Sequence, residues 1–463
     1  MVAKPRHGIS SVLAALACVA AVALAVAPPP AGVAPLTMHA AAVVVLAIGL
    51  WSTGALPEYV TAMIFFLFAV LFHLAPPAVV FSGFYSVAAW MVFGGLVFGV
   101  AVHTTGLGAR IASGLVQHFK GSYFGIIAGV VLVTGALAFV LPSATGRVMI
   151  MMPIIIALAD KLGFAPGTRG RIGMCLALGT GTLYPTFAIM PAAVPNLVLL
   201  GAAESIYKVQ FQYGEWLLLH FPVLGLLSFA ALPFLIARLY PDTPRVVADE
   251  GSPGRTSAEQ KRLMLYLAGA LALWITDFWH HVSPSWVALG VAILCVLPRV
   301  GVMPATNLVQ KVNFGPWLFV CGVIGMGAVV TQSGLGAALG KFLFSIAPLV
   351  PGEDLRNFAT TAAIGMGLGL VSGMPGQPAV MTPLADQIVA GTGWPLVTAL
   401  MTEATSWNMA LFPYQLPPIV LTLALGGLRI GQAMRLMVPF ALFSWIVLLP
   451  LEFLWWRFLG YFG

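Results

Sequence analysis

A polar stretch, Pro142–Arg147, separates two apolar segments that are both too short to cross a bilayer. Tyr123–Phe139 and Val148–Leu158 each fall below the roughly 20 apolar residues of a membrane-spanning helix. We therefore predict a re-entrant hairpin over residues 122–162, with its tip at Pro142–Arg147 inside the membrane. Irregular backbone at that depth must be buried in protein or line a watery cavity. A cation there is typical of a functional site.

The composition places the whole chain in a lipid bilayer. Of the 463 residues, 60% are hydrophobic and 8% are charged, whereas soluble domains carry roughly 25% charged residues. The length accommodates about eleven spans together with hairpins. We therefore predict an all-α polytopic membrane protein. The net charge of +7 comes from loops, where it reports topology, so we expect no nucleic-acid partner.

The second half of the chain repeats the first. Matching residues have similar separations: 227 residues for Trp90 and Trp317, 230 for Pro153 and Pro383, and 223 for Pro195 and Pro418. Such offsets indicate an internal repeat. We expect a first span in 1–36, repeat 1 in 37–239, a cytoplasmic linker in 240–262 and repeat 2 in 263–463. Each repeat has a hairpin, at 122–162 and 358–391, and a broken helix, at 171–202 and 395–426.

Each repeat is expected to hold five spans, and an odd number of spans gives the two repeats opposite orientations. Inverted repeats of this kind are typical of secondary transporters. With the N-terminus in the cytoplasm, the inner loops hold 16 Lys and Arg residues and the outer loops hold 4, which satisfies the positive-inside rule. We therefore predict a multi-pass protein of the inner membrane. Ile9–Ala27 is expected to be a retained span, with a cleaved signal peptide as the alternative.

The hairpin tips and broken helices supply the polar groups of a binding site. Half-helix N-termini offer free N–H groups that suit a carboxylate or a sulfate. Arg147 can hold an oxyanion with two parallel hydrogen bonds, or it can bond hairpin carbonyls as a structural residue. The predicted substrate-binding residues are Ser143, Ala144, Thr145, Gly146, Arg147, Pro195, Asn196, Gly376, Gln377 and Pro417.

A coupling ion is expected beside the substrate. The predicted ion-coupling residues are Ser143, Gly179, Gly181, Glu403 and Asn408. Glu403 is the candidate proton carrier, although it could equally lie at the outer interface. The prolines and glycines of the broken helices could also be kinks that only aid packing, because both residues are common in membrane helices.

Other classes of protein are less consistent with the sequence. An integral-membrane enzyme would need clustered His, Asp or Glu residues, or a nucleophile beside its base, and we find neither arrangement. A phosphate-binding Gly-x-x-x-x-Gly-Lys-Ser/Thr loop is also missing from the sequence. We therefore expect no catalytic residues, no metal site and no cofactor other than Na+ or H+ as a coupling ion. An anion channel remains an alternative.

The order of hairpin, broken helix and repeat resembles the divalent anion–sodium symporter family of dicarboxylate, citrate and sulfate transporters. The first tip, Ser143–Val148, is similar to the family motif Ser-Asn-Thr-Ala-Thr-Ala, with Pro153 in register. Residues 193–196 and 416–419 partly match the family motif Thr-Pro-Pro-Asn. The resemblance implies secondary active transport of a small anion, a di- or tricarboxylate. It also implies a homodimer in which a transport domain moves as an elevator.

The tips also depart from the family pattern. The family's Asn, which resembles a sodium and substrate ligand, is replaced by Ala144 and Met374, and Gly373 and Pro375 replace hydroxyl residues. We hypothesise that Arg147 supplies a fixed positive charge where relatives bind sodium. The chain would then be an anion exchanger, a uniporter or a proton-coupled carrier. Sulfate or a sulfonate is the alternative substrate, and the direction of transport stays open.

Overall fold

The computed structural model describes residues 9–30, 33–108, 110, 122–139, 141, 143–244 and 256–462. The regular structure of these residues is helical, which confirms the predicted all-α class. Among them, five helices are long and apolar enough to cross a membrane, and seven shorter apolar helices accompany them. Val140, Pro142 and residues 245–255 of the predicted linker lie outside the described residues.

The first half contains the helices of its early spans, one hairpin, one broken helix and a last span. The early helices are α1 (Ile9–Val26), α2 (Pro35–Thr53), α3 (Glu58–Leu71), α4 (Pro77–Val80), α5 (Ser82–Tyr85) and α6 (Val87–Thr105). The hairpin is α8 (Tyr123–Ala138) and α9 (Ala144–Lys161). The broken helix is α10 (Arg169–Gly181), η1 (Tyr184–Ala188), η2 (Met190–Ala192) and α11 (Val194–Tyr207). The last span is α12 (Tyr213–His220), η3 (Phe221–Gly225) and α13 (Leu226–Leu239).

The second half follows the same order of elements. Its early helices are α14 (Ala258–Ile275), α15 (Asp277–His280), α16 (Pro284–Val296), α17 (Thr306–Gln310), α18 (Gly315–Gln332) and α19 (Leu335–Ile346). The hairpin is α20 (Asp354–Ser372), α21 (Gln377–Met381), η4 (Thr382–Leu384) and α22 (Ala385–Thr392). The broken helix is α23 (Leu396–Met401), η5 (Thr402–Met409), η6 (Pro413–Gln415) and α24 (Pro417–Gly426). The last span is α25 (Ile430–Phe443), η7 (Ser444–Leu448) and α26 (Leu449–Phe458).

Local chemistry explains several helix ends. α6 begins after Ser86, whose Oγ accepts the N–H of Ala89 at 3.2 Å, as an N-cap does. α14 begins inside the predicted linker, because Ser257 and Gln260 form a reciprocal capping box. The linker is therefore shorter than the sequence indicates.

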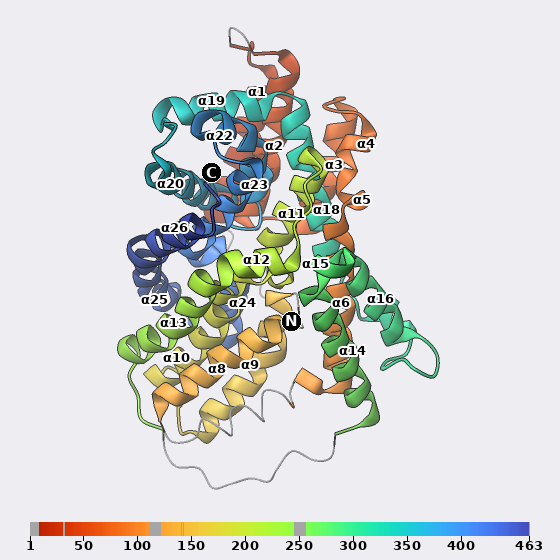
Figure 1. Cartoon of the computed structure of the whole chain (residues 1–463), viewed down its shortest axis with the longest axis vertical. Helices are drawn as coiled ribbons and strands as arrows, with labels where there is room; N and C mark the ends of the chain where they lie inside the picture. The colour runs from red at the N-terminus through yellow and green to blue at the C-terminus, as the bar shows by residue number, and fades with distance from the viewer. Residues whose placement is uncertain are drawn as a thin grey trace.

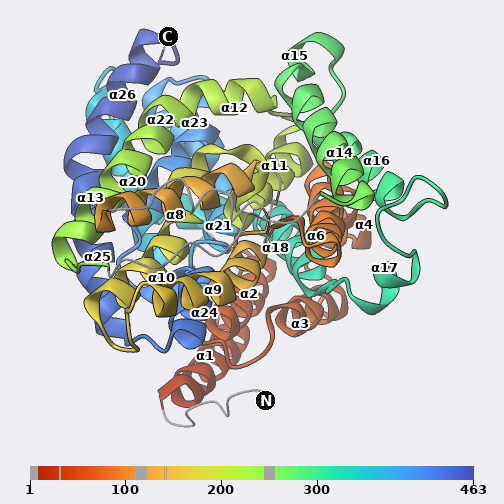
Figure 2. The same ribbon diagram turned by 90° about the horizontal axis from the view of Figure 1, so that it is seen from below.

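The helices form two groups in space (Figure 1). Helices α3, α4, α6, α14 and α16 lie together on the right, and the two hairpins with the last spans lie on the left. Figure 2 shows the same separation from below. One buried apolar core joins α18 to α2 and α3, with Phe65 and Ile324 among its members. A larger core fills the hairpins and the broken helices.

The broken helix of each half packs against the hairpin of the other half. α11 contacts α21 and η4, and α24 contacts α9 and α10. The irregular part of each broken helix is its break, η1 and η2 in the first half and η5 and η6 in the second. The two breaks also meet, since η1 packs against η5 and the rings of Phe187 and Trp407 are 5.8 Å apart. This exchange brings both breaks and both hairpins into one central region.

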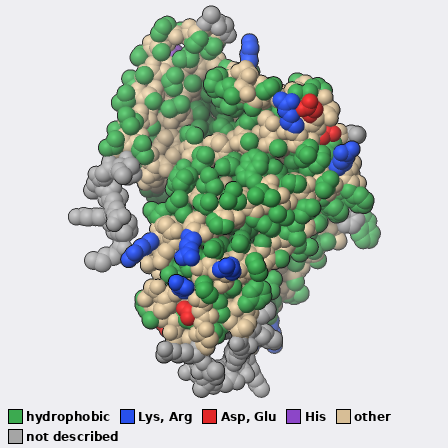
Figure 3. Space-filling view, turned by 90° about the vertical axis from the view of Figure 1, so that its left-hand side faces the viewer, with side chains coloured by type: hydrophobic (Ala, Val, Ile, Leu, Met, Phe, Trp, Pro, Cys, Tyr) green, Lys and Arg blue, Asp and Glu red, His purple; other side chains and the backbone are tan. Residues whose placement is uncertain are grey.

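The outer face of the left-hand group is mostly apolar. Figure 3 shows a broad band of hydrophobic side chains there, with Lys and Arg gathered toward its two ends. An apolar band bordered by charge is the surface that a bilayer requires.

Candidate functional site

Helix α9 of the first hairpin begins at Ala144, four residues before the predicted apolar segment that starts at Val148. Ser143 caps α9, because its Oγ accepts the N–H of Gly146 at 3.0 Å. Thr145, Gly146 and Arg147 therefore lie in the beginning of α9 instead of in an irregular tip, which corrects the predicted tip at Pro142–Arg147. Pro142 itself lies outside the described residues.

Arg147 is fully buried and bonds to oxygen atoms on both sides of the first break. Its Nε donates to Thr182 Oγ1 and a terminal nitrogen donates to the Thr182 carbonyl, both at 2.7 Å. The same terminal nitrogen reaches Ala192 O at 3.0 Å and Thr186 Oγ1 at 3.3 Å. The other terminal nitrogen donates to Leu141 O. Three carbonyl and two hydroxyl oxygens thus surround the guanidinium.

The second hairpin makes a corresponding but uncharged contact. Its turn begins at Gly373, whose φ of +70° is readily adopted only by glycine. The N–H of Met374 then donates to Gln415 O at 2.9 Å. Gln377 is buried at the start of α21, and its Nε2 donates to Ser406 Oγ at 2.8 Å. Each hairpin therefore donates a hydrogen bond to a hydroxyl in the broken helix of its own half.

Several buried amides near the breaks keep one polar atom without a partner among the described residues. Asn196 Nδ2 donates to the carbonyls of Phe187 and Ile189 at 3.0 and 2.9 Å, and its Oδ1 is unpartnered. Gln415 Oε1 accepts two backbone N–H groups, which leaves Nε2 as a donor. Buried polar atoms of this kind need a ligand or water. The complete set near the breaks is Asn196 Oδ1, Gln377 Oε1, Trp407 Nε1, Asn408 Oδ1 and Gln415 Nε2.

Glu403 lies in η5 and is 1% exposed, so its carboxyl group is buried inside the protein. Its carboxylate accepts the hydroxyl of Thr382 at 3.2 Å. The carbonyl of Thr382 in turn accepts the hydroxyl of Tyr207 at 3.2 Å. Glu403 thereby links the second hairpin and the second break to the end of α11.

The two predicted ion-coupling glycines are sites of close packing. A Cβ atom on Gly179 would lie 2.7 Å from Thr422 Oγ1, and one on Gly181 would lie 2.8 Å from Thr134 Oγ1. Glycine at these two positions lets α24 and α8 pack closely against α10. Their small size therefore has a packing reason.

The other predicted residues differ in burial. Pro195, Ala144 and Gly376 are buried, Ser143 and Pro417 are half-buried, and Thr145 is exposed. Asn408 is buried, and its Nδ2 donates weakly to Ser228 Oγ at 3.4 Å. The structure thus brings Arg147 and Asn196 to the first break, and Gln377 and Asn408 to the second.

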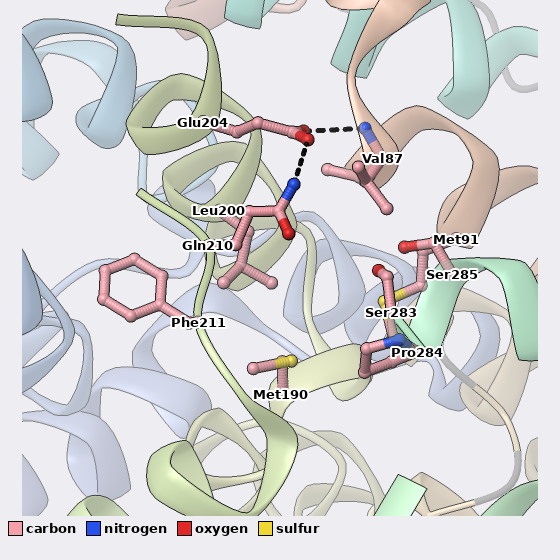
Figure 4. Close-up of a pocket in the computed structure, with 11 residues that line it drawn as sticks. Val87, Met91, Met190, Leu200, Glu204, Gln210, Phe211, Ser283, Pro284 and Ser285 are labelled. Atoms are coloured by element: carbon pink, nitrogen blue, oxygen red, sulfur yellow. Dashed lines mark hydrogen bonds between the residues drawn. The ribbon is translucent and has the colours of Figure 1, made fainter. Parts of the chain in front are cut away.

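A small cavity of about 40 Å³ lies between helices α6 and α16 and the broken helix of the first half (Figure 4). Met91 on α6 and Ser285 on α16 line one side, and Met190 and Leu200 line the other. Glu204 on α11 closes part of it by accepting the N–H of Val87 at 2.8 Å. The cavity therefore lies beside the contact between α6 and α11.

Sequence reasoning missed several residues at this site. Thr182, Thr186, Ser406 and Gln415 all lie in the breaks, and their polar side chains inside apolar segments were the available signal. The sequence analysis also missed the buried pair His220 and Glu452, whose signal is likewise an ionisable side chain inside an apolar segment.

A helical membrane protein in which two hairpins meet two discontinuous helices has the architecture of a secondary transporter. The chain belongs to the sodium:sulfate symporter family, whose transmembrane region matches residues 9–462. This confirms the resemblance found in the sequence and the prediction that the chain is not an enzyme. It is a multi-pass secondary transporter of divalent anions.

Individual relatives agree with this assignment. A membrane protein of Cupriavidus necator is 26% identical over 98% of this chain and 93% of its own length. The L-tartrate/succinate antiporter of Escherichia coli K12 is 28% identical over 57% of this chain. That match spans 56% of the antiporter, little more than half of its length. The YdaH transporter of Alcanivorax borkumensis, a solved structure, shares the fold with a TM-score of 0.52 and 17% identity over 82% of this chain and 86% of its own.

Proposed function

We propose that this protein carries a small dicarboxylate across the inner membrane without a sodium gradient, with its N-terminus in the cytoplasm. The observation that carries the proposal is the set of five oxygen atoms around the Arg147 guanidinium. Carbonyl oxygens freed by unwound helices coordinate Na+ in secondary transporters. Arg147 fills such a set of oxygens with a charge that cannot dissociate.

A fixed charge changes how an anion is held. A sodium ion contributes its charge only while bound, whereas an arginine stays protonated throughout. The guanidinium donates to protein oxygens, so we assign it the role of a positioning residue and a source of positive potential. The substrate carboxylates would be held by half-helix N-termini, as at α11, and by the free Nε2 donor of Gln415.

The proposed substrate class follows from charge and from the relatives. One fixed cation with two helix N-termini suits a dianion with separated carboxylates. The antiporters that match this chain are named for tartrate and succinate, which are dicarboxylates. Sulfate is the second candidate, because the family description names it.

We also propose that the two groups of helices move relative to each other in an elevator-like step, within a homodimer. The cavity beside Glu204 supports a moving boundary between α6 and α11. In this arrangement the hairpins and breaks form the transport domain, and α3, α6, α14 and α16 belong to the scaffold. The two halves would be inverted repeats, as their common order of elements suggests.

Uptake of labelled succinate into proteoliposomes tests the proposal. We expect saturable uptake into vesicles loaded with succinate, equal in sodium and choline buffers. A requirement for sodium would overturn the role of Arg147. Uptake of labelled sulfate alone would favour the second candidate, and flux that neither saturates nor responds to internal succinate would indicate a channel.

A further inference from the structure

A histidine and a glutamate form a buried pair away from the breaks. His220 ends α12 and Glu452 lies in α26, and both side chains are fully buried. His220 Nδ1 lies 3.1 Å from Glu452 Oε1. Ionisable residues inside membrane segments are costly and are typical of functional sites.

A π-helical turn lies close to each residue of the pair along its own helix. The π-helical turn η3 begins directly after His220, and the π-helical turn η7 ends at Leu448, four residues before Glu452. Such turns often occur at functional sites. Each one interrupts a helix that is otherwise long enough to cross the membrane.

The pair is connected by packing to the breaks. The ring of His220 lies 4.7 Å from that of Trp216, which stacks on Trp407 at 6.3 Å. Trp216 Nε1 donates to the Phe187 carbonyl at 3.3 Å, the same oxygen that Asn196 Nδ2 reaches at 3.0 Å. A shift of Asn196 or η1 would therefore move Trp216 and change its contact with the ring of His220.

The hydrogen bonds define where a proton can bind. Trp456 Nε1, which can only donate, reaches Glu452 Oε1 at 3.1 Å. Oε1 is thus an acceptor, and in the tautomer with its proton on Nδ1 His220 also donates to it. His220 Nε2 and Glu452 Oε2 are buried and have no partner among the described residues. These two atoms are the available positions for one more proton.

We infer that His220 and Glu452 form a proton-binding site inside the membrane that couples proton movement to the proposed dicarboxylate transport. With a proton on Nε2 or Oε2 the pair has no net charge, and without it the pair carries one negative charge. The aromatic surroundings favour the neutral form. The proton leaves to water when movement of the last spans admits water to Nε2 or Oε2.

Several other titratable groups on the elements that pack against the pair have partners of their own. Glu215 accepts the hydroxyl of Tyr461, Asp277 accepts the N–H of Tyr213, and Asp354 accepts Trp394 Nε1. Arg356 pairs with Glu353, and Tyr184 donates to Ala410 O. The remaining titratable groups on these elements are Arg457 on α26, His280 on α15, and Glu259, Lys261, Arg262 and Tyr266 on α14.

The first arm of the test measures proton binding without transport. Infrared difference spectra of the purified protein in nanodiscs between two pH values are expected to show a carboxyl band that Glu452→Gln removes. The matched control is Asp354→Asn, since Asp354 also accepts a tryptophan N–H but has no histidine beside it. A band that persists in Glu452→Gln would overturn the proton site.

The second arm measures coupling, which rests on the proposed function. Proteoliposomes containing a trapped pH dye receive succinate on the outside, and the wild type is expected to acidify the interior. Glu452→Gln and His220→Asn should lose this acidification yet keep succinate counterflow, and Asp354→Asn should keep both. Counterflow with no proton movement in the wild type would overturn the coupling. Absence of counterflow in every protein would count against the proposed function, while the infrared arm still decides the proton site.

Discussion

Arg147 and Thr182 share two hydrogen bonds, one to the hydroxyl oxygen and one to the carbonyl oxygen of the same threonine, both 2.7 Å long. Together they join the beginning of α9 to the end of α10. A planar guanidinium can make both bonds at once, whereas a lysine ammonium cannot match that geometry.

We therefore expect Arg147→Lys to destabilise the protein more than Thr182→Val. Thr182→Val removes one bond to a charged group, and we expect it to lower the free energy of unfolding by about 1.5–3 kcal/mol. Thr186→Val is the milder control, because its bond to Arg147 is longer, at 3.3 Å. Thermal unfolding in detergent measures all three, and an equal loss in Arg147→Lys and Thr186→Val would contradict the interpretation.

Removal of the guanidinium should create a sodium site. Arg147→Ala leaves the carbonyls of Leu141, Thr182 and Ala192 without their donor, and Na+ can replace it. At a sodium concentration about 10 to 100 times the dissociation constant, sodium binding should raise the free energy of unfolding of the variant by about 1.4–2.7 kcal/mol. The measurement compares melting temperatures in sodium and choline chloride. The wild type should be indifferent to the exchange, and an indifferent Arg147→Ala would refute the idea.

Close packing at Gly179 can be tested with a double mutant. Gly179→Ala would bring its Cβ within 2.7 Å of Thr422 Oγ1. We expect this overpacking to lower the free energy of unfolding by about 1–3 kcal/mol. Thr422→Ala should recover part of this loss, because it removes the two closest atoms. Gly290→Ala is the control, since nothing lies within 4 Å of that position. Strictly additive effects of the Gly179 and Thr422 changes on the free energy of unfolding would show that the two residues do not interact in the folded protein.

Movement between the two groups of helices should change access to the cavity beside Glu204. Ser285 is buried there, so a cysteine at this position, in a background lacking the native cysteines, should react slowly with a water-soluble thiol reagent. Adding succinate on both sides of the vesicles should raise the reaction rate. Ser345→Cys on the exposed part of α19 should react at the same rate in both conditions. An unchanged rate at position 285 would count against the elevator step.

The hairpins and breaks could be predicted from the sequence because their signals are local. Proline and glycine interrupt apolar runs, and Arg147 is the charge that stands out among them. The partners of Arg147 could not be predicted, because Thr182 and Ala192 reach it only after α10 folds back against α9. Helix α9 begins earlier than the sequence indicates, because Ser143, a predicted ligand, caps the helix instead.

The contact between His220 and Glu452 could not be predicted from the sequence either. The two residues are 232 positions apart, and each lies in a segment that is otherwise plainly apolar. Their distance from each other depends on how the last spans of the two halves pack. The sequence marks each residue as costly in a membrane, but it carries no local pattern that joins them.

The π-helical turns η3 and η7 have a consequence for the history of the chain. They begin at Phe221 and Ser444, 223 positions apart, and Pro195 and Pro418 have the same separation. A π turn holds one residue more than the α-helical turn around it. If the halves arose by duplication, the extra residue was already present in the single ancestral unit. The irregular turn in each last span is then older than the difference between Arg147 and Gln377. The sequences of the two hairpins would have diverged while the π-helical turn of each last span was kept.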